Sequence, residues 1–469
     1  MPQNSHSRFR ETLIVSGSAS SVLLVLSWPA FKYFFFSEAF TYLRIYNANG
    51  GHLLRAAFSR LDGMFFRPSF FLADIWWHFV LPPDPMIYHI RNAIFCIINL
   101  VLFHRVLLKF VQSRQARIIA VGLFAVSKMH MTIIGYVVVY EASVLLMTIL
   151  LAVLFWFRYL ENKRTMDYVL TLLFCTFSVF SKDNGLLVVV ILVTIVAAID
   201  LKRDELKKAM SYWSLRLAPF AVVSCSYLGL RYILTGPINP DNPIYSPRFS
   251  IPVILWQAKA FFATVGNFSL SNPGFMGERG LTGLLADNSK VVEFALCGAL
   301  WLFILYVCWQ ARQRWRLQLV PLVWIGLYLF PIFLIRNHQV YYHQEPLVGV
   351  ALLIGISLDR AKRSLVISSY IVIVLIAVNG LLSNQRSYYY WQGTADRAEA
   401  VVKPIVAAHA SNPPKAIVFV TSPEMRNFWL FAIGGPLIPH LLRSPDTAVD
   451  VVDSTSQIRS DAQVYYLPQ

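Results

Sequence analysis

The amino-acid sequence predicts an all-α membrane protein of about eleven spans, with interfacial helices after the first span and a small α/β domain at the C-terminus. Three observations lead to this fold class. The 469-residue chain is 57% hydrophobic and has a mean hydropathy of +0.54. Only 14% of its residues are charged, whereas a soluble domain carries about a quarter. Apolar runs long enough to cross a bilayer recur along most of the chain.

The apolar runs define the predicted spans. Arg8 and Arg10 precede the first run, which is too long for a cleavable signal peptide, so we expect an uncleaved signal anchor. Residues 251–268 are also apolar, but they lie in a stretch rich in Pro, Gly and Asn, so we expect a re-entrant or interfacial helix there. The spans are expected at residues 13–36, 87–108, 118–136, 137–157, 168–180, 186–199, 217–234, 291–309, 319–335, 346–358 and 365–382.

Basic residues fall in every second loop, and such loops stay on the cytoplasmic side of a membrane. We therefore expect a cytoplasmic N-terminus and an extracytoplasmic C-terminal domain, in a bacterial inner membrane or the endoplasmic reticulum. The net charge of +16 does not indicate nucleic-acid binding, because it is divided among these short clusters. The clusters after the N-terminus lie at residues 105–117, 158–164, 202–208, 312–316 and 360–363.

The segments that follow the first and the last span differ from the rest. Residues 40–58 and 65–80 mix arginines with Leu, Phe and Trp, a pattern typical of helices that lie on a membrane surface. From residue 384 the composition changes, with helical spacing at 395–410 and strand patterns at 415–420, 449–452 and 463–467. The sequence thus predicts a transmembrane domain at 1–383 and a small α/β domain at 384–469.

Polar residues on the predicted outer face collect in a few loops, which helices ending at one face would bring into a single cavity. Glu38 ends the first span, where a carboxylate is costly unless it is paired, hydrated or functional. Structural readings stay open: Glu38 could mark the water line, Lys182 and Asp183 could form a salt bridge, and Glu141 could pair with Lys128 or His130.

Five short motifs occur in a characteristic order: Glu38-Ala39-Phe40-Thr41-Tyr42-Leu43, Phe66-Arg67-Pro68, Tyr88-His89-Ile90-Arg91-Asn92, Ser181-Lys182-Asp183 and Tyr341-Tyr342-His343-Gln344-Glu345-Pro346. This order resembles the GT-C superfamily of polytopic glycosyltransferases, in particular the protein O-mannosyltransferase-like branch, here without tetratricopeptide repeats. The resemblance covers roughly residues 10 to 380. The chain departs from it where Glu38 replaces the usual Asp and where Asp183 replaces Glu in a Ser-Lys-Glu motif.

The resemblance implies a polyprenyl-phosphate-linked sugar donor, inverting transfer on the extracytoplasmic face, and an acceptor hydroxyl on a protein, lipid or glycan. A carboxylate suits the base that takes the acceptor proton, and Glu38 is the candidate. Cationic side chains suit the leaving phosphate. His343 and Glu345 could also ligate a divalent metal, which stays open. The candidate phosphate contacts are Arg67, Arg91 and Lys182, and the candidate substrate-orienting residues are Asp183, His89, Tyr42, Glu345 and His343.

A polytopic transporter or lipid flippase without transferase activity is the alternative from another functional class. Such proteins are built from internal repeats and from helices broken near the middle of the membrane. The sequence shows no clear sign of either feature.

Overall fold

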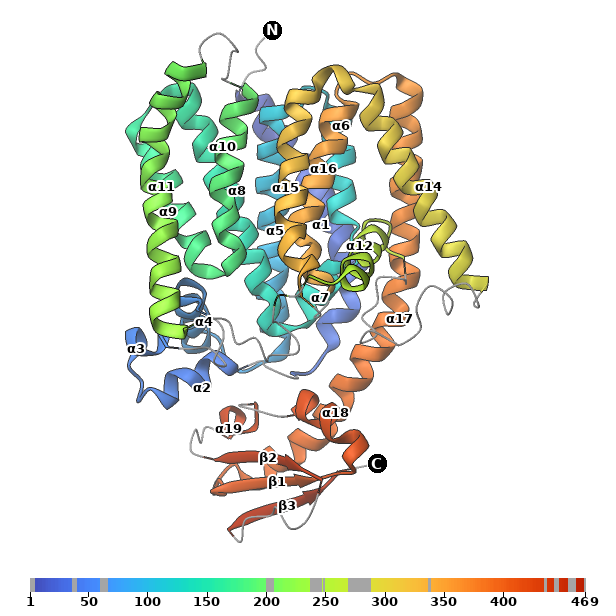
Figure 1. The fold of residues 1–469 in the computed structure, drawn as a ribbon. Coiled ribbons are helices and arrows are strands. Elements are labelled where there is room, and N and C mark those ends of the chain that lie inside the picture. The colour runs from blue at the N-terminus through green and yellow to red at the C-terminus, as the bar shows by residue number, and fades with distance from the viewer. Residues whose placement is uncertain are drawn as a thin grey trace.

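The protein consists of a helical bundle and a small α/β unit beneath it (Figure 1). The computed structural model describes residues 5–35, 40–59, 66–199, 206–236, 247, 249–268, 288–335, 339–433, 437–442, 447–453 and 461–467. Each predicted span overlaps one or two of the observed helices. The bundle helices are α1 (Ser5–Ser27), α5 (Pro85–Phe110), α6 (Arg114–Ala125), α7 (Met129–Gly135), α8 (Tyr140–Asn162), α9 (Thr165–Ser181), α10 (Leu187–Ile199), α11 (Leu206–Thr235), α14 (Asn288–Gln310), α15 (Trp315–Phe333), α16 (Gln344–Leu358) and α17 (Arg363–His409).

The all-α, multi-pass fold class is confirmed. Within the described residues, seven helical segments are long and apolar enough to cross a bilayer, or eight when α6 and α7, which meet at an angle of 51°, count as one span. Three further bundle helices are shorter than the ~20 residues of a full span: α9, α10 and α16 have 17, 13 and 15 residues. They stand alongside the longer helices in Figure 1.

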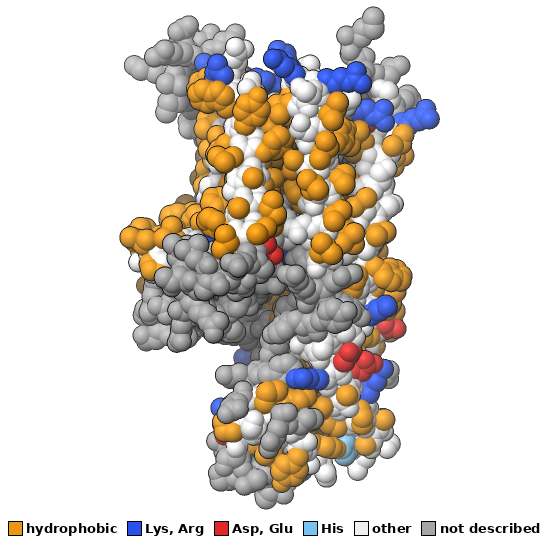
Figure 2. Space-filling model, turned by 90° about the vertical axis from the view of Figure 1, so that its right-hand side faces the viewer, with side chains coloured by type: hydrophobic (Ala, Val, Ile, Leu, Met, Phe, Trp, Pro, Cys, Tyr) orange, Lys and Arg blue, Asp and Glu red, His pale blue; other side chains and the backbone are white. Residues whose placement is uncertain are grey.

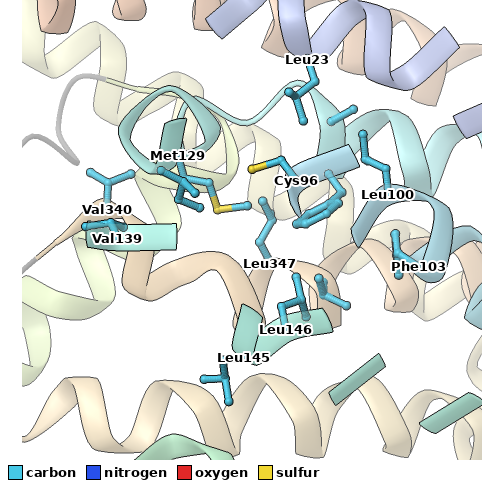
Figure 3. Packing of buried hydrophobic residues seen from close by; sticks show 14 of the residues in the cluster. Leu23, Cys96, Leu100, Phe103, Met129, Val139, Leu145, Leu146, Val340 and Leu347 are labelled. Atoms are coloured by element: carbon cyan, nitrogen blue, oxygen red, sulfur yellow. The ribbon is translucent and has the colours of Figure 1, made fainter. Parts of the chain in front are cut away.

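Helix α16 lies at the centre of the bundle, and all of its residues are buried. Its Leu347 packs among Cys96 and Leu100 of α5, Met129 of α7 and Leu146 of α8 (Figure 3). Close packing of this kind fixes the relative positions of helices from distant parts of the chain.

The two ends of the bundle differ in charge. Four of the predicted basic clusters lie at the junctions of α5 with α6, α8 with α9, α14 with α15, and α16 with α17, all at the upper end in Figure 1, which we call the basic end. The cluster at 202–208 falls partly outside the described residues. At the opposite end lie three short helices, α2 (Thr41–Ala48), α3 (Leu53–Ala57) and α4 (Pro68–Val80). We call this the α4 end. Leu54, Trp76 and Phe79 are 69%, 64% and 63% exposed there, as expected for interfacial helices.

Helix α12 (Ile251–Val265) has 15 residues and is seen nearly end-on in Figure 1, so its axis runs across the bundle. It ends at Gly266 and at Asn267, whose φ of 59° is left-handed. The Asn267 amide donates to the carbonyls of Val126 and Ile376 and accepts from the Lys128 N–H. These bonds dock α12 at the break between α6 and α7, in agreement with the expected re-entrant or interfacial helix.

The C-terminal unit contains a parallel sheet in the order β2-β1-β3, formed by β1 (Ala416–Val420), β2 (Ala448–Val452) and β3 (Ala462–Tyr466). Ala416 pairs with Ala448 on one side and with Ala462 on the other. The predicted strands are therefore confirmed to within a residue or two. Helices α18 (Pro423–Ile433) and α19 (Leu437–Leu441) complete the unit. The expected boundary at residue 384 falls inside α17, a single helix of 47 residues.

Membrane orientation can be tested by cysteine labelling in a background that carries Cys225→Ser. We expect a membrane-impermeant thiol reagent added outside intact cells to label Asn412→Cys, next to the C-terminal unit, and to spare Arg312→Cys, because basic loops stay in the cytoplasm. Permeabilised cells, in which both positions should react, are the control. External labelling at position 312 would reverse the predicted orientation.

Candidate active site

A buried carboxylate, Glu141 in the first turn of α8, joins three residues from separate sequence motifs. Arg67 Nη1 lies 2.5 Å from its Oε2, and Lys182 Nζ lies 3.1 Å from its Oε1. The Tyr42 hydroxyl lies 3.5 Å from Oε2. The structure thus brings together Tyr42, Arg67 and Lys182 at the α4 end. Glu141 itself was not among the predicted site residues.

Local structure explains how these side chains are held. Arg67 directly precedes α4, whose first residue, Pro68, has a φ suited to a helix start. The hydroxyl oxygen of Tyr227 on α11 lies 3.1 Å from the Phe66 carbonyl oxygen. The Tyr42 ring packs on Phe70 with a centroid distance of 5.1 Å. The site residues are therefore fixed by helix starts and by aromatic packing.

Lys182 ends α9 in an extended conformation, immediately before the short helix η3 (Asp183–Leu186). A Cβ atom on Gly185 would come within 1.9 Å of the Ser178 carbonyl oxygen. Only glycine fits this close approach of η3 to the end of α9. The tight turn directs the Lys182 side chain toward Glu141.

The late tyrosine-rich turn also reaches this site. Lys182 Nζ lies 5.6 Å and 5.3 Å from the ring centroids of Tyr341 and Tyr342, within cation–π range. Glu345, at the start of α16, interacts electrostatically with Lys182 and Glu141. The convergence of distant loops that the sequence predicts is thus present in the described part of the chain.

Asp183 does not pair with Lys182, so the structural reading as a mutual salt bridge is wrong. Its Oδ1 accepts from the Tyr227 hydroxyl at 2.6 Å and from Arg231 Nε at 3.0 Å. Sequence reasoning missed Tyr227 and Arg231. An arginine inside the apolar run of α11 was the signal that could have found them, because charges within spans are usually paired.

The suggested pairing of Glu141 with Lys128 or His130 is also wrong. Lys128 Nζ donates to the Phe268 carbonyl at 2.6 Å, and His130 Nε2 lies 2.9 Å from the Phe124 carbonyl oxygen. Both residues form hydrogen bonds at the break between α6 and α7, whereas Glu141 faces α4 and α9.

Arg91 makes no contact with Glu141 in the described part of the chain, and its role as a phosphate contact stays a prediction. Its guanidinium lies 3.6 Å from the Tyr140 ring centroid, and Nη2 donates to Asn92 Oδ1 and to the Val137 carbonyl. Its Nη1 lies 3.6 Å from Asp74 Oδ1. With its guanidinium buried and engaged in this way, Arg91 supports the start of α8.

The two predicted histidines also have structural surroundings instead of facing the site. His89 is fully buried, with Nδ1 2.7 Å from the Ile134 carbonyl oxygen and Nε2 2.9 Å from that of Tyr33. It fastens α5 to α7 and to the end of the first span. His343 Nδ1 lies 2.9 Å from Thr264 Oγ1 on α12. These contacts do not test whether the two histidines orient substrates, so that role stays a prediction.

Behind the Glu141 site lies a second polar set that the sequence analysis did not identify. His78 Nε2 is 2.9 Å from Asp74 Oδ2, and His78 Nδ1 is 2.9 Å from the Tyr88 hydroxyl. Burial raises the pKa of Asp74, but His78 and Arg91 outweigh it and hold this pKa below its usual range. The aspartate is therefore ionised, and it fixes the hydrogen-bonding direction of the His78 ring.

Glu38 lies outside the described residues. The residues that flank its loop are described: the rings of Phe35 and Phe40 have centroids 4.9 Å apart. Among the residues that the structure describes, no three His, Cys, Asp or Glu side chains come together as a metal site would require. The open metal question therefore receives no support from the described residues.

Comparison with known proteins shows similarity in structure. No protein-family model matches the sequence, and no curated protein is significantly similar to it. The structure of ArnT from Cupriavidus metallidurans bound to undecaprenyl phosphate superposes with a TM-score of 0.56 at 11% identity, over 93% of this chain and 85% of that one.

The Archaeoglobus fulgidus oligosaccharyltransferase, tethered with an acceptor peptide containing the NVT sequon, superposes with a TM-score of 0.54 at 11% identity. The match covers 93% of this chain and 63% of that one. At such identities the likeness shows the fold alone. The fold is the GT-C fold that these glycosyltransferases share, and the O-mannosyltransferase-like branch is not distinguished by it.

The Gly185 turn gives a testable prediction about the site. Gly185→Ala must push η3 away from α9, because the new Cβ has no room beside the Ser178 carbonyl. We expect a loss of about 1–3 kcal/mol of stability, as for other overpacked positions, measured as a lower Tm in detergent. Gly326→Ala on α15, where a Cβ meets nothing within 4 Å, is the matched control. Equal Tm values for both variants would contradict the tight turn.

Proposed function

We propose that this protein is a membrane glycosyltransferase that transfers a sugar from a polyprenyl-phosphate donor to an acceptor hydroxyl at the α4 end, on the extracytoplasmic side. The observation that carries the proposal is the assembly of Arg67 and Lys182 around Glu141 at one end of a GT-C fold. One solved structure with this fold, that of ArnT, is bound to undecaprenyl phosphate.

Arg67 and Lys182 are suited to the leaving phosphate. Together with Glu141 they leave one net positive charge, held before any substrate arrives. Preorganised cations stabilise charge that develops in the transition state without having to reorganise. The planar guanidinium of Arg67 can bind two phosphate oxygens at once, while Lys182 acts as a point charge. Both side chains are nearly buried, at 12% and 10% exposure, which strengthens these interactions.

Glu38 remains our candidate for the general base. It lies four residues before Tyr42, whose hydroxyl contacts Glu141, and four residues of extended chain span at most about 14 Å. In the reaction, the acceptor oxygen attacks the anomeric carbon and its proton passes to the Glu38 carboxylate. The bond from the anomeric carbon to the phosphate oxygen breaks, and polyprenyl phosphate leaves with the electron pair. Attack opposite the leaving group inverts the anomeric configuration.

The remaining candidates divide by position. Tyr42, Asp183 and Glu345 belong to the site and are proposed to orient substrate. Asp183 has the most open side chain, at 41% exposure, and suits contact with sugar or acceptor hydroxyls. Glu345 interacts electrostatically with Lys182, and it is proposed to contact the donor next to the phosphate. Arg91, His89 and His343 hold the surrounding helices in place.

The base assignment is tested by transfer of labelled sugar from polyprenyl-phosphate donors in proteoliposomes. We expect Glu38→Gln to lower the transfer rate by about 10²–10⁴-fold, the usual contribution of a general base, with donor binding retained. Equal transfer by the wild type and the variant would remove Glu38 as the base. A wild type that moves lipid across the bilayer and transfers no sugar would instead favour the flippase alternative.

The phosphate contacts are tested by Arg67→Lys, which keeps the charge and removes the bidentate geometry. A charge-assisted hydrogen bond contributes about 1.5–3 kcal/mol, so we expect kcat/KM for the donor to fall by roughly 10–100-fold. Arg55→Lys on α3, an exposed arginine at the same end, is the matched control and should transfer normally. Normal donor kinetics in Arg67→Lys would exclude a bidentate role.

A further inference from the structure

An apolar cleft separates α14 from α17 near the basic end of the bundle. One wall is the stripe from Leu300 to Val307 on α14, and the other is the stripe from Ser369 to Ile376 on α17. Both stripes repeat at i, i+3, i+4 and i+7, so each forms one face of its helix. Ile119 of α6 and Ile354 of α16 contribute to the floor. The enclosed part of the cleft is narrow, with a cavity volume of about 20 Å³.

The chemistry of the walls selects what can fill this cleft. Every lining residue is apolar except Ser369, and the Ser369 hydroxyl donates to the Leu365 carbonyl in its own helix. An apolar cavity does not hold water. An empty cavity is unfavourable because its lining atoms lack partners for dispersion contacts. On the outward sides of the same two helices, Leu305 and Val374 are both 60% exposed. Hydrocarbon from the bilayer is therefore the occupant that suits the cleft.

Three exposed arginines on or next to the lining helices α6, α14 and α17 lie at the same end. Arg114 lies five residues before Ile119 on α6, and Arg363 lies six before Ser369 on α17. Arg312 follows Val307 by five residues, just beyond the end of α14. At 1.5 Å per helical residue, the charges sit about 8–9 Å beyond the apolar stripes. Figure 2, which views this side of the molecule, shows Lys and Arg along the top of an apolar surface.

Nearby acids do not neutralise these three arginines. Asp359 accepts from the Gln112 and Ser113 backbone N–H groups and pairs with Arg314 at 2.8 Å. Glu11 is paired with Arg117. Among the described residues, both of these buried acids are thus committed to other cations, and the field at the mouth of the cleft is positive.

We propose that this cleft binds an acyl chain of an anionic glycerophospholipid from the adjacent leaflet, with the lipid phosphate held among Arg114, Arg312 and Arg363. An apolar slot with a cationic mouth at headgroup depth matches both parts of such a lipid. The lipid fills the gap between α14 and the bundle. Only 22% of the spanning window of α14 is buried within the protein, so the lipid also stabilises the position of this helix. The proposal is independent of the proposed transferase activity, whose site lies at the α4 end.

The test uses the full-length protein, delipidated in detergent and then supplied with palmitoyl-oleoyl phosphatidylglycerol or phosphatidylcholine. Bound lipid is counted by native mass spectrometry, and Tm is measured in parallel. We expect the wild type to retain phosphatidylglycerol selectively and to gain Tm from it. Ile373→Trp, which fills the cleft, should lose both effects. Val374→Trp, on the exposed side of the same helix, should keep them.

A second arm tests the mouth of the cleft without altering its packing. The double variant Arg114→Gln/Arg363→Gln should retain phosphatidylglycerol about thirtyfold less well, at about 1 kcal/mol for each arginine. Arg316→Gln on α15, outside the cleft walls, should bind like the wild type. The proposal would be overturned if the wild type retained the two lipids equally. It would also be overturned if Arg316→Gln lost as much phosphatidylglycerol as the double variant, or if Ile373→Trp and Val374→Trp behaved alike. If Ile373→Trp does not fold, the charge variants decide.

Discussion

The interaction on which the α4 end depends is the pair of ionic contacts to Glu141. A carboxylate buried between helices is tolerated only when cations compensate its charge, and removing one partner of such a group costs far more than the bond itself. Arg67 precedes α4, Lys182 ends α9, and Glu141 begins α8. The charge requirement therefore ties three elements together at one point and determines where their ends meet.

Two kinds of support surround this point. The polar set of Asp74, His78, Tyr88 and Arg91 holds α4 against α5 and the start of α8. The central helix α16 supplies an apolar core along its whole length. The residues of the proposed site thus occupy the ends of helices whose other residues are engaged in packing. This division is common in enzymes, because a rigid scaffold positions functional groups that loops and helix ends present.

The fold was largely predictable from the sequence because a bilayer leaves few choices. Backbone groups in hydrocarbon must bond within a helix, so each apolar run became one, and the alternation of basic loops ordered their ends. The strands of the C-terminal unit followed from short β-branched runs. At the site, the ordered motifs indicated that Tyr42, Arg67 and Lys182 would converge.

The partners inside the site were less predictable. Lys128 and His130 are close to Glu141 in sequence, but the break between α6 and α7 uses both of them, and the partners of Glu141 come from 74 and 41 residues away. His89 and Arg91 belong to a motif-like run, yet helix rotation turns both into the protein. Asp74 and His78 were hidden in an aromatic stretch that resembles an ordinary membrane interface. In each case, the direction in which a side chain points determines its partners. Composition and spacing do not encode this direction.

Helix α17 has a consequence for access to the reaction. Its 47 residues correspond to a rod of about 70 Å, and the Lys403 ammonium near its far end lies 5.9 Å from the Phe34 ring centroid at the end of the first span. The sheet is thus connected to the bundle by a continuous helix instead of a flexible linker. Under the proposed transferase activity, an acceptor reaches the α4 end from the side, because the C-terminal unit lies beneath the bundle (Figure 1).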